Sequence, residues 1–366
     1  MRDLLTRLDA ATPADRDRAL DALRALAVLG VVIGHWLVTA LVMESGTVRV
    51  ASPLRSMPQL APVSWVFQTL AVFFLVGGLV ATRGHLRARA RGVSYGRWLA
   101  GRAARLFRPA AALVAVWAVA APAMLAWGAE LESVWALVKL VLSPMWFLLV
   151  FAALTAATPL VSRLHPAWPL AVVGVVDLAR FTVDGADGLG WVNVVAGWLV
   201  PYCMGAAWAR RGLPGRAAGW ALLAGGGAAA VALVTWGGYP AAMVGVPGAP
   251  LSNLDPPSLA AVAFGLAQSG AAVLLLGPLR RLLRRPAAWG AVALTNLAAM
   301  TIFLWHQTAT IAVASVALLA GRLPGLHTAP DGLGWVLARP AWLPVFAAVL
   351  LVCCTAFHVH ERRAAG

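Results

Sequence analysis

Residues 21–36 read DALRALAVLGVVIGHW, an apolar run that contains a histidine, His35, where leucine or valine would be expected. The run continues to about residue 43, and about 20 apolar residues suffice to cross the hydrocarbon core of a bilayer. Arg24 precedes His35 by eleven positions, close to three turns of an α-helix, so the two side chains share one helix face. An ionisable side chain inside a membrane span is costly, and such a residue indicates a functional site.

The composition is that of a membrane protein. Hydrophobic residues make up 61% of the 366-residue chain and charged residues only 12%, whereas soluble domains are about 45–50% apolar and about 25% charged. We therefore predict an all-α, polytopic membrane protein with about ten transmembrane helices and no large soluble domain. Its predicted parts are a cytoplasmic N-terminal segment (1–20), a ten-helix membrane domain (21–358) and a cytoplasmic tail (359–366). The ten apolar stretches lie at about 23–43, 64–83, 104–127, 143–160, 168–183, 191–209, 217–236, 259–279, 291–320 and 338–357.

The formal net charge of +15 reflects orientation in the membrane and not a nucleic-acid partner. When the N-terminus is placed in the cytoplasm, 23 of the 29 basic residues fall on inner segments, as the positive-inside rule requires. We therefore expect a multi-pass protein of the cytoplasmic (inner) membrane with both termini in the cytoplasm. No stretch resembles a cleaved signal peptide, and the three cysteines, all in apolar stretches, do not indicate a disulfide framework.

His35 is the first candidate for chemistry. It lies ten residues past Ala25, about 15 Å along a helix and near the middle of a hydrocarbon core about 30 Å thick. Burial disfavours the charged ring, which predicts a neutral imidazole able to accept a proton. The alternative is a histidine that only hydrogen-bonds a neighbouring helix, and the arginine on the same face weighs against it.

The stretch GRAARLFRP, residues 101–109, contains a second candidate group. Arg102 and Arg105 are spaced i, i+3 and neighbour each other on one helix face. Two guanidinium groups at that spacing can hold a phosphate or pyrophosphate through bidentate hydrogen bonds. Ordinary anchoring of a helix at the inner membrane surface remains the alternative for this pair.

Three further stretches bring aromatic and polar side chains into apolar segments. LAVFFLVGGLVATRG (70–84) sets aromatic bulk beside two glycines, which alone would indicate helix packing. SPMWFL (143–148) contains a tryptophan that would also fit an interfacial aromatic belt. TIFLWHQT (301–308) adds a second histidine, which favours a polar cavity. The candidate cavity-lining residues are Phe73, Phe74, Gly77, Trp146, Trp305 and His306.

Taken together in their order and position, these motifs resemble membrane acyltransferase family 3, a group of integral membrane O-acyltransferases that modify bacterial glycans, lipids and metabolites. The resemblance spans Asp21 to about Thr308. The chain departs from the family at Gly77, where the family usually has serine, so no role of that hydroxyl carries over. The matching motifs are R-x10-H (Arg24, His35), FFLVGG (73–78), RxxR (Arg102, Arg105), WFL at Trp146 and LWHQ (304–307).

The resemblance implies an O-acyltransferase that moves an acyl group, by default acetyl, from acyl-coenzyme A on the cytoplasmic side to a hydroxyl of a glycan, glycolipid or metabolite in the cell envelope. The phosphates of such a donor need cations at the inner mouth, where Arg24, Arg102 and Arg105 are expected. His35 would be the general base, or would carry the acyl group as a transient acyl-histidine. We expect no permanently bound cofactor and no metal site, because the other histidines are scattered and Cys353–Cys354 is too compact to form one alone.

A second function class stays open at this point. In a secondary transporter or exporter, His35 and His306 would form a proton relay. The scarcity of intramembrane carboxylates weighs against it, and Asp177, with Arg180 three positions later, is the best remaining carboxylate. An inactive scaffold is the third alternative.

Overall fold

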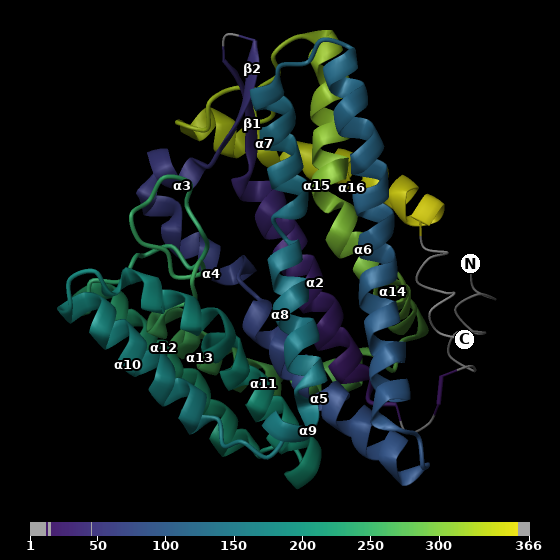
Figure 1. Ribbon diagram of the computed structural model, residues 1–366, viewed down its shortest axis with the longest axis vertical. Coiled ribbons are helices and arrows are strands. Elements are labelled where there is room, and N and C mark those ends of the chain that lie inside the picture. The colour runs from purple at the N-terminus through teal and green to yellow at the C-terminus, as the bar shows by residue number, and fades with distance from the viewer. Residues whose placement is uncertain (1–11, 14–15, 45, 358–366) are drawn as a thin grey trace.

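A computed structural model describes residues 12–13, 16–44 and 46–357, so parts of the predicted N-terminal segment and all of the predicted tail (359–366) lie outside the described residues. These residues form a bundle of helices with one two-stranded antiparallel sheet (Figure 1). The longer elements are α2 (Arg18–Val38), β1 (Ala40–Glu44), β2 (Thr47–Ala51), α5 (Leu70–Ala90), α6 (Tyr95–Ala126), α7 (Leu131–Leu142), α8 (Met145–Ala156), α10 (Ala167–Thr182), α11 (Asn193–Arg211), α12 (Arg216–Trp236), α13 (Leu259–Leu282), α14 (Pro286–Leu297), α15 (Ala299–Ala317) and α16 (Leu333–Phe357). Short helical segments are α3 (Pro53–Ser56), η1 (Pro58–Val63), α4 (Ser64–Phe67), α9 (Thr158–Val161), η2 (Ala186–Val192) and η3 (Leu318–Ala320).

The helices confirm the predicted fold class. Nine helical stretches among the described residues are long and apolar enough to cross a membrane, and these residues contain no large soluble domain. The predicted stretch 143–160 contains α8, which joins α7 in one span of 26 residues. The predicted stretch 168–183 forms α10, which has only 16 residues and is shorter than the usual bilayer-spanning helix.

Helix α2 starts and ends earlier than the sequence pattern predicts. Asp17 caps its first turn by accepting a hydrogen bond from the Ala19 N–H (3.2 Å). The helix stops at Val38 because the next residues are extended and pair with β2, from Ala40 opposite Ala51 to Glu44 opposite Thr47. The predicted span of 23–43 is therefore wrong at both ends. As a result, His35 lies three residues before the end of α2 and not at the middle of its span.

Glycines let the helices that carry the site approach closely. A Cβ atom at Gly78 would clash with the Tyr202 carbonyl group of α11, and one at Gly205 would clash with the Leu75 carbonyl group of α5. The glycine-rich face of α12 packs on α13 in the same way, since a Cβ at Gly226 would lie 2.7 Å from the Ala263 carbonyl oxygen. These contacts fix α5 and α11 against each other next to the site described below.

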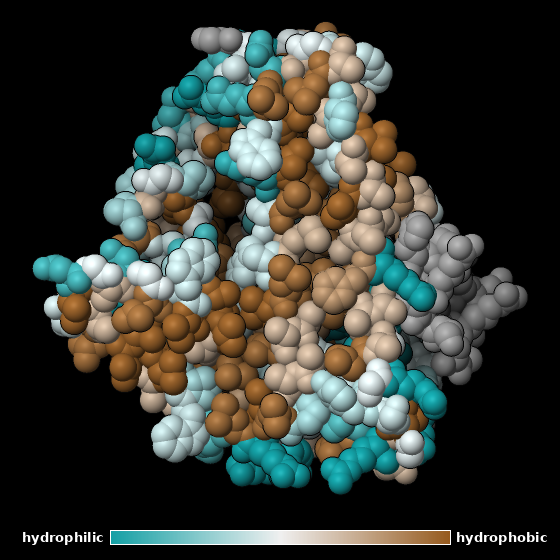
Figure 2. Space-filling view, viewed as in Figure 1, coloured by the Kyte–Doolittle hydropathy of each residue, from teal (hydrophilic) through white to brown (hydrophobic). Residues whose placement is uncertain are grey.

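The bundle has two chemically different ends. We call the end where α5 passes into α6 the arginine-rich end, because it carries Arg83, Arg87, Arg102 and Arg105, and the opposite end, with β1 and β2, the hairpin end (Figure 1). Figure 2 shows a broad hydrophobic band between more hydrophilic ends, as expected for a protein whose middle faces lipid. The chain is thus a multi-pass membrane protein.

Candidate active site

A cavity of about 470 Å³ lies at the arginine-rich end, between the start of α2, the end of α5 and the start of α6. It brings together the three arginines that the sequence singles out, although Arg24 and Arg102 are 78 positions apart. Its walls are partly apolar, with Leu20, Val76 and Leu79 among them. The charged lining residues are Arg16, Arg24, Arg83, Arg87, Arg102, Arg105, Asp17 and Asp21.

Both acids of this cavity are held in ion pairs. Asp21 pairs with Arg16 at 2.6 Å, and Asp17 pairs with Arg280 of α13 at the same distance. Since six arginines face two aspartates, the lining carries a positive excess. A concave site with such a lining attracts and holds anions, phosphates above all.

Arg102 is positioned by the backbone of α5. Its Nη2 donates to the Val80 carbonyl oxygen at 3.4 Å and lies where a Cβ atom of residue 84 would be, so Gly84 makes room for the guanidinium group. Its Nε is buried and lacks a hydrogen-bond partner among the described residues. Arg105 is more exposed and donates from Nε to the Gly101 carbonyl oxygen one turn back (3.0 Å). Arg102 thus presents an unsatisfied donor next to the cavity.

His35 and His306 meet in the interior, away from this cavity. Their ring centroids are 5.1 Å apart and the ring planes are tilted by 39°. His306 is fully buried on α15, whereas His35 is partly exposed. The Trp36 indole N–H donates to the His306 carbonyl oxygen at 3.1 Å and ties α2 to α15 at this level.

The cavity at the arginine-rich end does not extend to His35. Its lining reaches Arg24 on α2 and Val76 on α5, whereas His35 lies eleven residues, or about 16 Å, beyond Arg24 along α2. Phe73, one turn beyond Val76 on α5, is only partly buried. The predicted common face of Arg24 and His35 therefore connects two separate places in the protein, an anion-binding mouth and an interior histidine pair.

An aromatic cluster lies between these two places. The Phe73 ring packs edge-on against Phe147 and Phe151 of α8, with centroids 4.9 and 5.0 Å away. Phe147 lies 5.2 Å from Phe303, which is 6.2 Å from the His306 ring. The cluster thus extends from the FFLVGG motif to the histidine pair.

The remaining predicted lining residues differ in position. Phe74 is fully buried and stacks on Trp198 (5.0 Å, 12°), and Trp146 borders the same tryptophan at 6.4 Å. Gly77 faces Phe151, whose ring fills the space that a side chain at residue 77 would need. Trp305 points elsewhere, because its ring stacks on Phe357 of α16 at 3.9 Å. It belongs to the packing of α15 on α16, whereas the other five belong to the aromatic cluster or to the histidine pair.

Two polar residues near the histidines were not among the predicted site residues. Arg339, 1% exposed on α16, donates from Nε to the Trp36 carbonyl oxygen (2.5 Å), from Nη2 to that of Thr39 (2.6 Å) and from Nη1 to that of Gly325 (2.9 Å). Gln307 follows His306, is fully buried, and has no partner for either side-chain polar atom among the described residues. An arginine within an apolar span and a glutamine beside an intramembrane histidine were the available signals.

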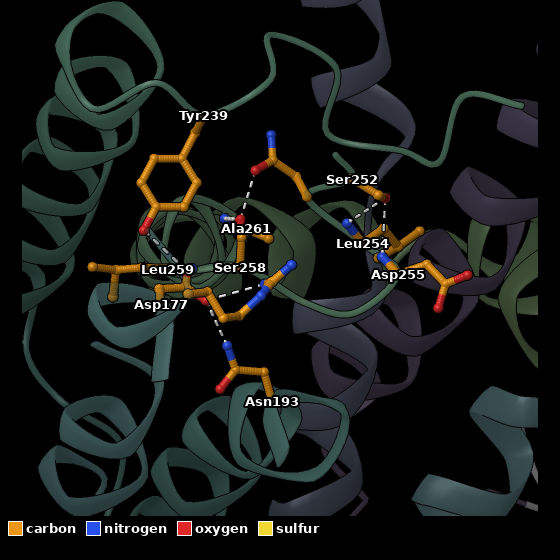
Figure 3. Close-up of polar contacts among 11 residues, drawn as sticks. Asp177, Asn193, Tyr239, Ser252, Leu254, Asp255, Ser258, Leu259 and Ala261 are labelled. Atoms are coloured by element: carbon orange, nitrogen blue, oxygen red, sulfur yellow. Dashed lines mark hydrogen bonds and ion pairs between the residues drawn. The ribbon is translucent and has the colours of Figure 1, made fainter. Parts of the chain in front are cut away.

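Asp177 forms a structural junction (Figure 3). Its Oδ1 accepts hydrogen bonds from Asn193 Nδ2 (2.8 Å) and Arg180 Nη1 (3.4 Å), and its Oδ2 accepts from the Tyr239 hydroxyl (3.0 Å) and the Leu259 N–H at the start of α13 (2.7 Å). Burial, reinforced by this carboxylate, raises the pKa of the Tyr239 phenol, so the hydroxyl stays protonated and donates. The carboxylate holds α10, α11, α13 and the preceding loop together.

Metal binding has no support in the described part of the chain, where no group of three or more His, Cys, Asp or Glu side chains could hold an ion. Comparison with known proteins gives one finding. The family model of acyltransferase family 3, described as an acyltransferase domain, matches residues 17–358. No curated protein and no solved structure matches the chain significantly.

Proposed function

We propose that this chain, which belongs to the membrane acyltransferase family 3, transfers an acyl group from acyl-coenzyme A to a hydroxyl group. Family membership makes it a membrane O-acyltransferase, which requires an acyl donor, an acceptor and a bilayer. The donor, the acyl group, which we take to be acetyl, and the acceptor, a glycan, glycolipid or metabolite of the cell envelope, are parts of our proposal.

The observation that carries the choice of donor is the cavity at the arginine-rich end. Coenzyme A ends in a nucleotide with three phosphate groups, and a concave site with six arginines against two ion-paired aspartates fits such a ligand. Acyl-coenzyme A is a cytosolic metabolite, and the positive-inside rule supports placing the arginine-rich end in the cytoplasm. The protein would then lie in the inner membrane with both termini cytoplasmic.

The thioester end of the donor must travel from this cavity towards His35. Phe73, Phe147 and Phe151 of the aromatic cluster lie between the cavity and the histidine pair. A change in the packing of these side chains would let the slender pantetheine arm pass. The acceptor would come from the hairpin end, where His35 is three residues from the end of α2. Figure 2 shows a hollow between the regions of α3 and α7, next to that end of α2 in the view of Figure 1.

In the proposed reaction His35 is the general base. It takes the proton of the acceptor hydroxyl as the oxygen attacks the thioester carbonyl carbon. The new C–O ester bond forms, the C–S bond breaks, and the proton passes from His35 to the departing thiolate, so free coenzyme A and the acylated acceptor are the products. A base in this position contributes about 10²–10⁴-fold to the rate.

Asp177, the best carboxylate for a transporter's proton relay, has a structural role instead. Asp177 accepts four hydrogen bonds and joins three helices, so its protonation would break the junction. Arginines gathered around a cavity favour a phosphate-bearing substrate over a proton path.

Transfer itself is the test. Purified protein in lipid nanodiscs should move radiolabel from [¹⁴C]acetyl-coenzyme A to an envelope glycan, lipid or metabolite fraction, and His35→Ala should abolish the transfer. His165→Asn is the matched control, because His165 is exposed and its Nδ1 caps the Ala167 N–H, a role that asparagine can fill. Wild-type rates in His35→Ala would overturn the mechanism, and the absence of transfer by the wild type to any fraction would overturn the proposed function.

A further inference from the structure

The protonation of the His306 ring follows from its hydrogen bond. Its Nδ1 lies 2.6 Å from the Phe303 carbonyl oxygen. A carbonyl oxygen can only accept, so Nδ1 carries the proton. In a neutral imidazole the other nitrogen, Nε2, then holds a lone pair and is an acceptor. This Nε2 is fully buried and has no hydrogen-bond partner among the described residues.

An unpaired acceptor in the interior costs free energy, typically about 1–3 kcal/mol, so its presence in a folded protein calls for an explanation. The nearest ring is that of His35, 5.1 Å away between centroids. Within the described residues no hydrogen bond holds either nitrogen of His35, whose ring can therefore turn an N–H towards His306. Catalytic hydrogen bonds are often long without substrate and shorten in the reacting complex.

We propose that His306 is a positioning residue for His35. Its Nε2 accepts a hydrogen bond from one nitrogen of the His35 ring, which fixes the tautomer of that ring and leaves the other nitrogen to take the proton of the acceptor hydroxyl. The chain Phe303 carbonyl, His306, His35, acceptor hydroxyl has the arrangement in which a catalytic base is oriented by a third group. This inference rests on the proposed function of His35.

A neutral imidazole suits this role in the interior. The third group of such an arrangement is commonly a carboxylate, and a buried carboxylate must overcome a large desolvation cost. A neutral imidazole avoids this cost, and only the proton taken from the acceptor brings a positive charge to the pair. The Trp36–His306 hydrogen bond holds the two helices at the required separation.

Substitutions at residue 306 separate the two ring nitrogens. Glutamine places a carbonyl oxygen near the position of Nε2, whereas asparagine replaces only Nδ1 and its bond to the Phe303 carbonyl. We expect His306→Gln to retain most of kcat, and His306→Asn and His306→Leu to lower kcat by about 10²-fold. The KM for acetyl-coenzyme A should change by less than about threefold in all three, because the donor cavity is distant. Equal kcat values for wild type and a folded His306→Asn, or loss of activity in His306→Gln as large as in His306→Leu, would overturn the proposal.

A spectroscopic measurement needs no activity. In protein labelled with ¹⁵N-histidine, the His35 signals, identified by their absence in His35→Ala, should show one tautomer in the wild type and in His306→Gln. His306→Leu should show a mixture of both tautomers. A single tautomer in His306→Leu would refute the positioning role even where acyl transfer by the wild type is established. Failure of this inference is therefore distinct from failure of the proposed function.

Discussion

Arg339 of α16 donates a hydrogen bond from Nε to the carbonyl oxygen of Trp36, the residue that follows His35. The same guanidinium group binds the Thr39 carbonyl just past the end of α2. The last carbonyl groups of a helix have no partner within it, and a cation at that end also interacts favourably with the helix dipole. A residue some 300 positions away in the sequence thus holds the end of the helix that presents His35.

Replacing Arg339 should destabilise the C-terminal end of α2. Arg339→Met removes all three donors and leaves buried carbonyl oxygens unpaired, at about 1–3 kcal/mol each, so we expect a fall of several degrees in the Tm measured in detergent and a clear loss of acyl transfer. Arg339→Lys keeps the charge, but its ammonium group cannot reach all three carbonyl oxygens. Its Tm should therefore lie between that of the wild type and that of Arg339→Met. Arg322→Met, at an exposed position of the same end, is the control and should have the wild-type Tm. A stable and fully active Arg339→Met would contradict the capping role.

Arg102 should act on donor binding. A hydrogen bond to a charged group contributes about 1.5–3 kcal/mol, so Arg102→Ala should raise the KM for acyl-coenzyme A by about 10- to 100-fold. Arg97→Ala removes an exposed arginine of the same helix outside the cavity and should leave KM unchanged. Steady-state kinetics over a range of donor concentrations measures both. Equal effects of the two substitutions would mean that general positive charge, and not the cavity, binds the donor.

Gly84 allows an independent test of the same site. A Cβ atom at residue 84 would occupy the place of Arg102 Nη2, and because that atom is the flexible end of a side chain the guanidinium group would move at little cost in stability. We expect Gly84→Ala to raise the KM for acyl-coenzyme A by about tenfold with an unchanged Tm. Gly96→Ala is the control, since nothing lies within 4 Å of a Cβ atom there. An unchanged KM in Gly84→Ala would show that the observed position of Arg102 does not matter for binding.

The parts of the site that the sequence predicts are those that depend on helical periodicity. Eleven residues make three turns, so Arg24 and His35 share a face, and three residues make a neighbouring pair, so Arg102 and Arg105 lie together. The gathering of arginines at one end of the bundle follows from the positive-inside rule. The two helix-face pairings depend only on nearby residues, and the charge distribution is a constraint that the membrane places on every segment.

The rest depends on contacts that no local pattern encodes. Residues 39–43 are as apolar as the helix before them, and only pairing with β2 and the Arg339 hydrogen bonds decide that α2 stops at Val38. Trp305 and His306 are adjacent in the sequence but face different helices, because successive side chains of a helix point about 100° apart. The position of α16 decides which of the two reaches His35.

The packing of Gly77 of α5 against Phe151 of α8 can be tested by changing the size of both side chains. Phe151 fills the space beside Gly77, so Gly77→Ser should overpack the contact and lower stability by about 1–3 kcal/mol. Phe151→Ala alone should leave a cavity and cost about 3–5 kcal/mol. In the double variant the serine should occupy part of that cavity, so the two losses should be less than additive when Tm or urea midpoints are compared. Strict additivity would mean that the two side chains do not compete for the same space.

Asp177 distinguishes structural support from proton transport. In Asp177→Asn the amide keeps one acceptor oxygen but turns an N–H₂ group towards groups that themselves donate, so we expect a loss of about 3 kcal/mol in stability. Proteolysis should then cut the loop between α12 and α13 faster, because Tyr239 and the start of α13 lose their common partner. Acyl transfer per folded molecule should stay near the wild-type value, as in the control Asp187→Asn at an exposed position. Abolished transfer in a folded Asp177→Asn would show instead that a proton on this carboxylate takes part in the reaction.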